Sequence, residues 1–277
     1  VILGEVWEDA VTKFSYGSRR KYALGDALDT VMNYPFRSAV LDFLCWRTDA
    51  WALKGFLISQ RLNYPQPMYF ALMNLLALAT RLDARSMNRE QQARFIVSDA
   101  QDARGAAMQR LAAAIQFTVP GVPSVYYGDE TGMNGMLDPF NRAPFTTGAR
   151  PLVDWYRTLG RARRDNDALS VGSAAFYSPN PDVLCILRCI TGGRDIFGER
   201  AEDGIFLCAV NRAAEPRDLV CDLWLDNTGL TAAELEALKA ANPTKGECIL
   251  SGERVSVAQG LVKITVPAED VRLYKLS

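Results

Sequence analysis

The first part of the chain, to about residue 168, alternates short apolar runs with longer helical patterns. This alternation is typical of parallel βα units. The apolar runs predict four strands, at Val1–Trp7, Leu28–Tyr34, Phe70–Leu76 and Ser124–Tyr127. Helical patterns lie at Ser38–Leu57, Gln101–Phe117 and Pro151–Asp165. A polar segment, residues 81–95, follows the third strand and predicts a loop or a loop-borne helix.

The pattern changes at about Ala168, and from there short strands alternate with turns. The strand-like runs are SAAFYSP, VLCILRCI, GIFLCAVN, DLVCDLWL, ECILS, RVSVAQ, LVKITVP and VRLYKLS. One helix is predicted at residues 231–241, because Thr231 and Glu234 have the spacing of a capping box. The chain therefore divides into an α/β part, residues 1–167, and an all-β sandwich domain, residues 168–277.

The charge of the chain narrows the choice of partners. It has 31 basic and 32 acidic residues and a formal net charge of -1, so the basic excess that attracts nucleic acid or anionic membranes is missing. No apolar run reaches the roughly 18 residues of a membrane span. We expect neither nucleic acid nor a membrane as partner, and we favour a neutral small-molecule substrate.

Cysteine and histidine usage limits the chemistry further. The six cysteines lie mostly in apolar runs without a C-x-x-C pair, which favours reduced core thiols over a zinc or redox site. No calcium-like cluster of oxygen ligands is seen, so we expect no metal and no other cofactor. Histidine is absent, and acid-base chemistry must rest on carboxylates, Tyr, Lys or Cys. We expect a cytoplasmic location and leave secretion open, because residue 1 is not a natural start.

Polar and aromatic side chains gather where the predicted strands end. In parallel βα folds the carboxyl ends of the strands form the site. The residues at these ends are Glu5, Trp7, Asn33, Tyr34, Tyr126, Tyr127, Asp129 and Glu130. Aromatic rings stack on the C–H faces of sugars, and carboxylates and amides pair with their hydroxyls, so this mixture suits a carbohydrate ligand.

Three segments, in order, resemble the α-amylase family of glycoside hydrolases. GEVW at residues 4–7 resembles its strand-five motif, and LDTVMNYPFR at residues 28–37 is similar to strand six of its neopullulanase and cyclomaltodextrinase branch. Residues 117–135 and 138–145 are similar to its strand-eight region. The resemblance implies that residues 1–167 form the second half of a (β/α)8 TIM barrel, strands five to eight, followed by the family's C-terminal β-sandwich domain.

The resemblance also implies a reaction, the retaining hydrolysis of α-glucosidic bonds in starch-like oligosaccharides. Glu5 matches the general acid/base, whose pKa partial burial beside Trp7 would raise. The positions that match the family's sugar contacts are Trp7, Glu8, Asn33, Tyr34, Asp138 and Arg142. An ion pair that holds the loop remains an alternative for Asp138 and Arg142, and core packing is favoured for Tyr126 and Tyr127.

The chain departs from the family pattern in two places. The family's aspartate nucleophile belongs on strand four, which the resemblance places before Val1. After MNLL, residues 73–76, the family's His-Asp pair is missing, and Asp83 is a poor substitute because apolar Leu82 and Ala84 flank it. We therefore expect a truncated chain that is inactive alone, with exposed barrel edges that could self-associate or bind a complementary half. The alternatives are a non-catalytic, amylase-like carbohydrate-binding or transporter-associated protein, and a starch-binding β module.

Overall fold

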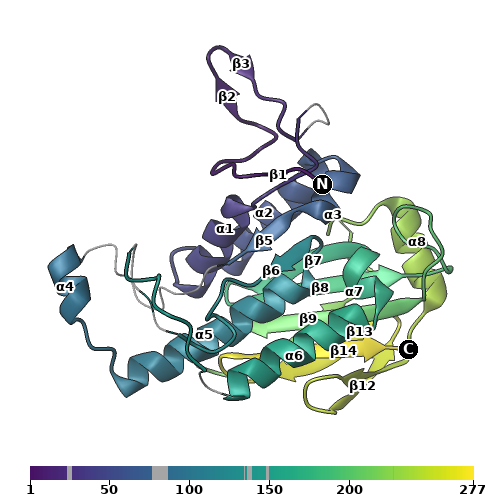
Figure 1. Cartoon of the computed structure of the whole chain (residues 1–277). Coiled ribbons are helices and arrows are strands. Elements are labelled where there is room, and N and C mark those ends of the chain that lie inside the picture. Colours follow the sequence, from purple (N-terminus) through teal and green to yellow (C-terminus); the bar gives the residue numbers. More distant parts are fainter. Residues whose placement is uncertain (24–26, 77–86, 134, 136–138, 148–149, 227) are drawn as a thin grey trace.

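The computed structural model describes all residues except 24–26, 77–86, 134, 136–138, 148–149 and 227 (Figure 1). Its first part contains four short parallel strands: β1 (Leu3–Gly4), β4 (Thr30–Val31), β5 (Met73–Leu75) and β6 (Val122–Ser124). β1 pairs with β4 and β5 pairs with β6, and a bridge between Met32 and Met73 joins the two pairs. The resulting order β1-β4-β5-β6 is an open half of a parallel barrel, which confirms the predicted α/β class.

These strands are shorter than the apolar runs predicted. Phe70, expected in the third strand, belongs to helix α3 (Gln66–Ala71), and β6 ends before the two tyrosines that were expected in it. A strand extends only where a neighbour completes its backbone hydrogen bonds, and within the described residues β1 and β6 each have a neighbour on one side. A small hairpin, β2 (Phe14–Ser15) and β3 (Ser18–Arg19), projects from this part (Figure 1).

The helices largely follow the predicted pattern, with one correction. The expected helix Ser38–Leu57 is two helices, α1 (Tyr34–Leu44) and α2 (Ala50–Asn63). The break has a local cause, because Asp49 caps α2 by accepting from the Ala52 amide at 2.8 Å. The remaining helices of this part are α4 (Arg89–Arg94), α5 (Asp99–Thr118), α6 (Arg150–Arg164) and α7 (Asp167–Val171).

The second part is an antiparallel sheet of eight described strands in the order β10-β13-β12-β11-β14-β9-β8-β7. Their bounds are β7 Ser173–Asn180, β8 Val183–Ile190, β9 Gly204–Asn211, β10 Arg217–Asp222, β11 Lys245–Cys248, β12 Arg254–Ala258, β13 Leu261–Val266 and β14 Asp270–Leu276. Helix α8 (Ala232–Ala241) carries the predicted capping box, with Thr231 and Glu234 each bonding the backbone of the other. The sheet folds over on itself as the predicted β-sandwich does.

Strand β8 is buried along its whole length because both of its faces are covered. Cys185 and Leu187 point into the interior of the β domain, and Leu184 and Ile186 belong to a second core shared with the helices. Figure 1 shows α5 and α6 lying across this sheet. The β domain and the helices of the half barrel therefore share one continuous apolar layer.

Two buried arginines close the carboxyl end of α5. Arg188 Nη1 donates to the carbonyl oxygens of Thr118 at 2.7 Å and Leu169 at 2.8 Å, and Arg163 Nη1 donates to that of Phe117 at 2.8 Å. The last carbonyls of a helix lack partners within it and carry the negative end of its dipole, so a cation suits them. Burial lowers the pKa of Arg188 to about 9 and that of Arg163 to about 10.

Candidate active site at the strand ends

Three of the predicted site residues meet at the carboxyl ends of β1 and β4. The Tyr34 hydroxyl donates to Glu5 Oε1 at 3.1 Å. The Trp7 ring stacks on the Tyr34 ring, with centroids 4.2 Å apart and planes at 14°. Trp7 is 66% exposed, so the outer face of its ring is open to a ligand. We call Glu5, Trp7 and Tyr34 the rim cluster.

The rim cluster combines a carboxylate, a hydroxyl donor and a flat apolar surface. Burial raises the pKa of Tyr34, and the hydrogen bond to Glu5 raises it further, so the phenol stays protonated at neutral pH. Glu5 itself is exposed. The expected partial burial of Glu5 beside Trp7 is absent from this chain, because the indole ring lies on Tyr34 instead. The arrangement can hold a sugar face against Trp7 and exchange a proton at Glu5.

Glu8 lies near this cluster in sequence but is bound elsewhere. Its carboxylate forms an ion pair with Lys13. The hydrogen bond from Lys13 lowers the pKa of Glu8. Glu8 is therefore held as an exposed anion by a neighbouring cation, and its predicted contact with a sugar stays a prediction.

Asn33 is buried in this structure, and its expected sugar contact stays a prediction. Its side chain is 2% exposed, and its amide nitrogen donates to Asn74 at 2.9 Å and to Gln60 at 3.2 Å. Its oxygen accepts from Gln60 at 2.9 Å and from the Phe36 amide at 3.2 Å, which caps α1. Asn33 thus joins β4, β5 and α2 from the inside. Successive residues of a strand point to opposite sides, so its place at a strand end did not settle its direction.

The network of buried amide side chains extends to the next strand, at positions that no sequence motif predicted. Gln116 Nε2 donates to the carbonyl oxygens of Asn74 at 2.7 Å and Ser124 at 2.8 Å. Asn74 Nδ2 donates to the carbonyl of Pro120 at 2.8 Å. These bonds tie the ends of β5 and β6 to α5. Buried Asn and Gln residues are uncommon, yet the sequence held no pattern that pointed to these positions.

The tyrosine pair differs from the prediction of core packing. Tyr127 is 42% exposed and its hydroxyl donates to the Ala143 carbonyl at 3.0 Å, and Tyr126 is half-buried. Both residues follow β6 instead of lying in it, so the alternation of a strand does not apply to them. Arg142 is exposed on the same loop. Asp138 lies outside the described residues, as does Asp83, and the sugar contact of Asp138 and Arg142 stays a prediction.

The cysteines have the state that their sequence context predicted. All six cysteines are free thiols, and all but Cys45 are buried, as the apolar context predicted. Among the described residues no group of three or more His, Cys, Asp or Glu side chains is arranged to hold a metal ion. No helix in the described ranges has both the length and the apolar character needed to cross a membrane.

Comparison with known proteins identifies the family. Residues 1–170 match the family described as alpha amylase, catalytic domain. The chain is 32% identical over 232 residues to an amylopullulanase of Thermoanaerobacter thermohydrosulfuricus, and the aligned region covers 76% of this chain and 15% of the relative. It is 32% identical over 178 residues to a cyclomaltodextrinase of Thermoanaerobacter pseudethanolicus, and this region covers 62% of this chain and 27% of the relative. The chain spans less than two fifths of the length of the curated relatives it matches.

Solved structures show the same fold. An Anoxybacillus α-amylase superposes with a TM-score of 0.70 at 20% identity, covering 99% of this chain and 52% of the other. A cyclomaltodextrinase superposes with a TM-score of 0.68 at 24% identity, covering 99% of this chain and 40% of the other. The resemblance read from three sequence segments is thereby confirmed, and the chain belongs to the α-amylase catalytic-domain family, in its neopullulanase- and cyclomaltodextrinase-like branch.

Proposed function

We propose that this chain supplies the acid/base half of a retaining glycosidase that acts on α-glucosidic bonds of starch-like oligosaccharides. The observation that carries the proposal is the rim cluster, a glutamate bonded to a tyrosine and flanked by an open indole ring at the carboxyl ends of parallel strands. The names of the relatives, amylopullulanase and cyclomaltodextrinase, support this class of substrate.

In this proposal Glu5 protonates the leaving glycosidic oxygen and later takes a proton from the attacking water. Tyr34 occupies Oε1 of Glu5, so Oε2, which has no partner among the described residues, carries the transferred proton. Trp7 holds the C–H face of a sugar ring beside it. The three side chains thus divide into a proton donor, the residue that orients it and a binding surface.

A retaining mechanism needs a second carboxylate, about 5 to 5.5 Å from the first. The neighbouring carboxylates are bound elsewhere: Asp9 accepts from the amides of Val11 and Thr12, both at 2.9 Å, and Asp29 accepts from that of Ile2 at 2.6 Å. We propose that the nucleophile comes from polypeptide outside these 277 residues. Loss of such partners lowers rates by about 10⁴ to 10⁶ in other hydrolases. The chain alone should therefore bind oligosaccharide without turning it over.

Calorimetric titration of the chain with maltoheptaose tests the binding part. Trp7→Ala should weaken binding by about tenfold, because loss of an aromatic contact costs about 0.5 to 1.5 kcal/mol beyond the area it buries. Glu5→Gln keeps the shape and should change affinity by no more than about threefold. Unchanged binding in Trp7→Ala would remove the rim cluster from the substrate site.

Reconstitution tests the catalytic part. The chain is mixed with a separately produced N-terminal half of the Thermoanaerobacter pseudethanolicus cyclomaltodextrinase, and release of reducing ends from maltoheptaose is measured. Glu5→Gln should abolish any activity gained, and Glu215→Gln, an exposed carboxylate of the β domain that pairs with Arg217, should keep most of it. Equal loss in both variants, or full activity in Glu5→Gln, contradicts the assigned role.

The open edges of the half barrel suggest a partner of another kind. Leu3 in β1 is 41% exposed, Val122 in β6 is 52% exposed, and Ile2, directly before β1, is 60% exposed. Unpaired strand edges with apolar side chains bind other strands. We propose that the isolated chain self-associates through β1 and β6. Sedimentation velocity should show mass that rises with concentration, reduced in Ile2→Lys/Val122→Lys; a monomer at every concentration rules this out.

We also propose a cytoplasmic location. Six free thiols, five of them buried, are typical of proteins from a reducing compartment. Cell fractionation with an antibody to the chain tests this. Recovery of the protein from the culture medium would refute it.

A further inference from the structure

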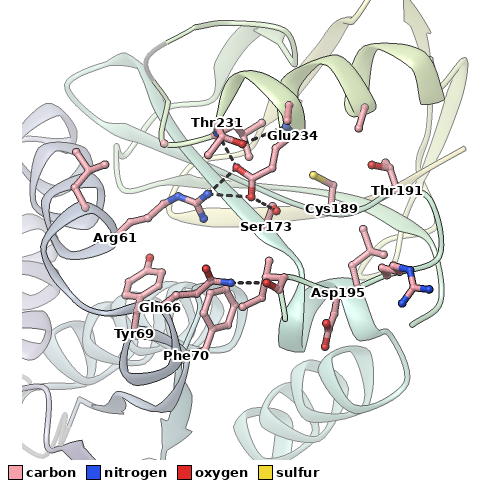
Figure 2. Close-up of a pocket in the computed structure, with 18 of the residues that line it drawn as sticks. Arg61, Gln66, Tyr69, Phe70, Ser173, Cys189, Thr191, Asp195, Thr231 and Glu234 are labelled. Atoms are coloured by element: carbon pink, nitrogen blue, oxygen red, sulfur yellow. Dashed lines mark hydrogen bonds and ion pairs between the residues drawn. The ribbon is translucent and has the colours of Figure 1, made fainter. Parts of the chain in front are cut away.

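A cavity of about 850 Å³ lies between the helices of the half barrel and the β domain, and none of the rim cluster lines it (Figure 2). Its wall comes from α2, α3, the start of β7, the end of β8 and α8. Helix α3 leads into the start of β5, whereas the rim cluster lies beyond the other ends of the parallel strands. The cavity is therefore separate from the proposed active site.

The charged side chains of the cavity balance each other. Arg61 Nη2 donates to both oxygens of Glu234, at 3.0 and 2.8 Å, and Ser173 and the Thr231 amide also donate to this carboxylate. Burial alone raises the pKa of Glu234, but these bonds outweigh it and the pKa is lowered. Asp195 accepts from the amides of its own loop, as from Phe197 at 2.9 Å. A ligand with a net charge would gain little here.

One hydroxyl in the cavity has no protein partner. Tyr69 is 4% exposed, and its hydroxyl forms no hydrogen bond with the described residues. Figure 2 shows this hydroxyl pointing into the cavity toward Arg61, whose Nε and Nη1 also have no hydrogen-bond partner in the described part of the chain. Burial raises the pKa of Tyr69, which keeps the phenol neutral. These donor atoms are accessible from the cavity and not sealed in the core, so a molecule that enters the cavity can accept hydrogen bonds from them.

The rest of the wall combines apolar side chains, including Ile58, Phe70 and Leu230, with the polar Gln66, Thr191 and Arg194. Ligand pockets of about 300 to 1,000 Å³ with a few convergent polar groups hold small molecules. We propose that this cavity binds a neutral, hydroxyl-rich molecule of one or two sugar rings. Tyr69 and Arg61 hydrogen-bond its hydroxyls, and Phe70 contacts its apolar face. This inference does not depend on the proposed catalytic role of Glu5.

The test uses the full chain with the rim disabled by Trp7→Ala, and maltose as the probe in isothermal titration. Saturable binding is expected in this background. Adding Tyr69→Phe removes one neutral hydrogen bond and should weaken maltose binding by about 2- to 12-fold. Tyr16→Phe, on the exposed hairpin, is the matched control and should leave the affinity unchanged.

A folding defect can be told apart from a binding defect. Tyr69→Phe deletes a hydroxyl that has no partner among the described residues, so the melting temperature should stay the same or rise. Ala237→Trp on α8 places a large ring in the cavity and should abolish maltose binding while the chain still melts cooperatively.

Three results would overturn the inference. The first is no saturable maltose binding to the Trp7→Ala chain at tens of millimolar, and the second is equal affinity with and without the Tyr69 hydroxyl. The third is inorganic phosphate binding more tightly than maltose, which would make the cavity an anion site. Failure of the Glu5 experiments leaves all of these measurements interpretable, because they use a different part of the surface.

Discussion

Replacement of Arg188 by Met should lower the free energy of unfolding more than a substitution at the surface does. The guanidinium is fully buried and donates to the carbonyl oxygens of Thr118 at 2.7 Å, Leu169 at 2.8 Å and Gly172 at 3.0 Å. Met keeps most of the length of the side chain, so the main loss is of these three bonds and of two longer ones, both 3.4 Å, to the carbonyl oxygens of Ser173 and Ser170. The carbonyls then stay buried without a partner.

The size of the effect follows from two opposing terms. Hydrogen bonds to a charged donor contribute about 1.5 to 3 kcal/mol each, and the buried cation costs several kcal/mol to desolvate. Removal of one member of a buried charged group destabilises proteins by about 3 to 5 kcal/mol, and we expect this range here. The melting temperature should fall by about 6 to 20 °C, from about 2 to 4 °C per kcal/mol in chains of similar size.

Urea unfolding followed by circular dichroism measures this change. The matched control is Arg164→Met, because the Arg164 side chain is 71% exposed and pairs with Asp165 at 2.7 Å. An exposed pair of this kind contributes at most about 1 kcal/mol. If Arg188→Met lies within about 1 kcal/mol of the unchanged chain, or costs no more than Arg164→Met, the bonds from Arg188 to these carbonyls do not stabilise the fold as argued.

Three further predictions concern the interior, the α8 ion pair and the thiols. Asn33→Ala should lower the free energy of unfolding by about 2 to 3 kcal/mol, because it removes one helix cap and the three buried hydrogen bonds with Gln60 and Asn74. The exposed Asn63→Ala should change it by less than about 0.5 kcal/mol in the same urea experiment. Since the folded-state pKa of Glu234 lies below its usual 4.5, its ionised form stabilises the fold above that pH, and this benefit is lost as pH falls through the folded-state value. Glu234→Gln should thus lower the melting temperature more at pH 7 than in increasingly acidic buffer, and an equal loss at every pH would refute the ion pair with Arg61. A thiol reagent should react rapidly with Cys45 alone in the native chain and with all six cysteines after unfolding, and a second fast thiol would contradict the buried strands.

The β domain could be predicted closely from the sequence alone. The bounds of β8 and β9 agree to the residue with the runs VLCILRCI and GIFLCAVN. A strand that is covered on both faces has a continuous apolar sequence between polar turns, so its ends are visible in the sequence. The capping box of α8 agrees for a similarly local reason, since a cap is a contact between neighbours in the chain. Glu5, Trp7 and Tyr34 were found through family motifs that lie within one or two strands.

Only the tertiary structure decided the direction of Asn33 and the burial of Arg188. Asn33 turns inward because Gln60 and Asn74, 27 and 41 residues away, present amides to it. Arg188 lies in a run that predicts an ordinary strand, and its partners are carbonyls as far as 70 residues distant. Hydrophobic periodicity predicts which face of a helix or strand is covered, but it does not indicate which distant backbone carbonyls need a hydrogen-bond donor. Those long-range pairings, like the short length of β1 beside a single neighbour, exist only once the chain has folded.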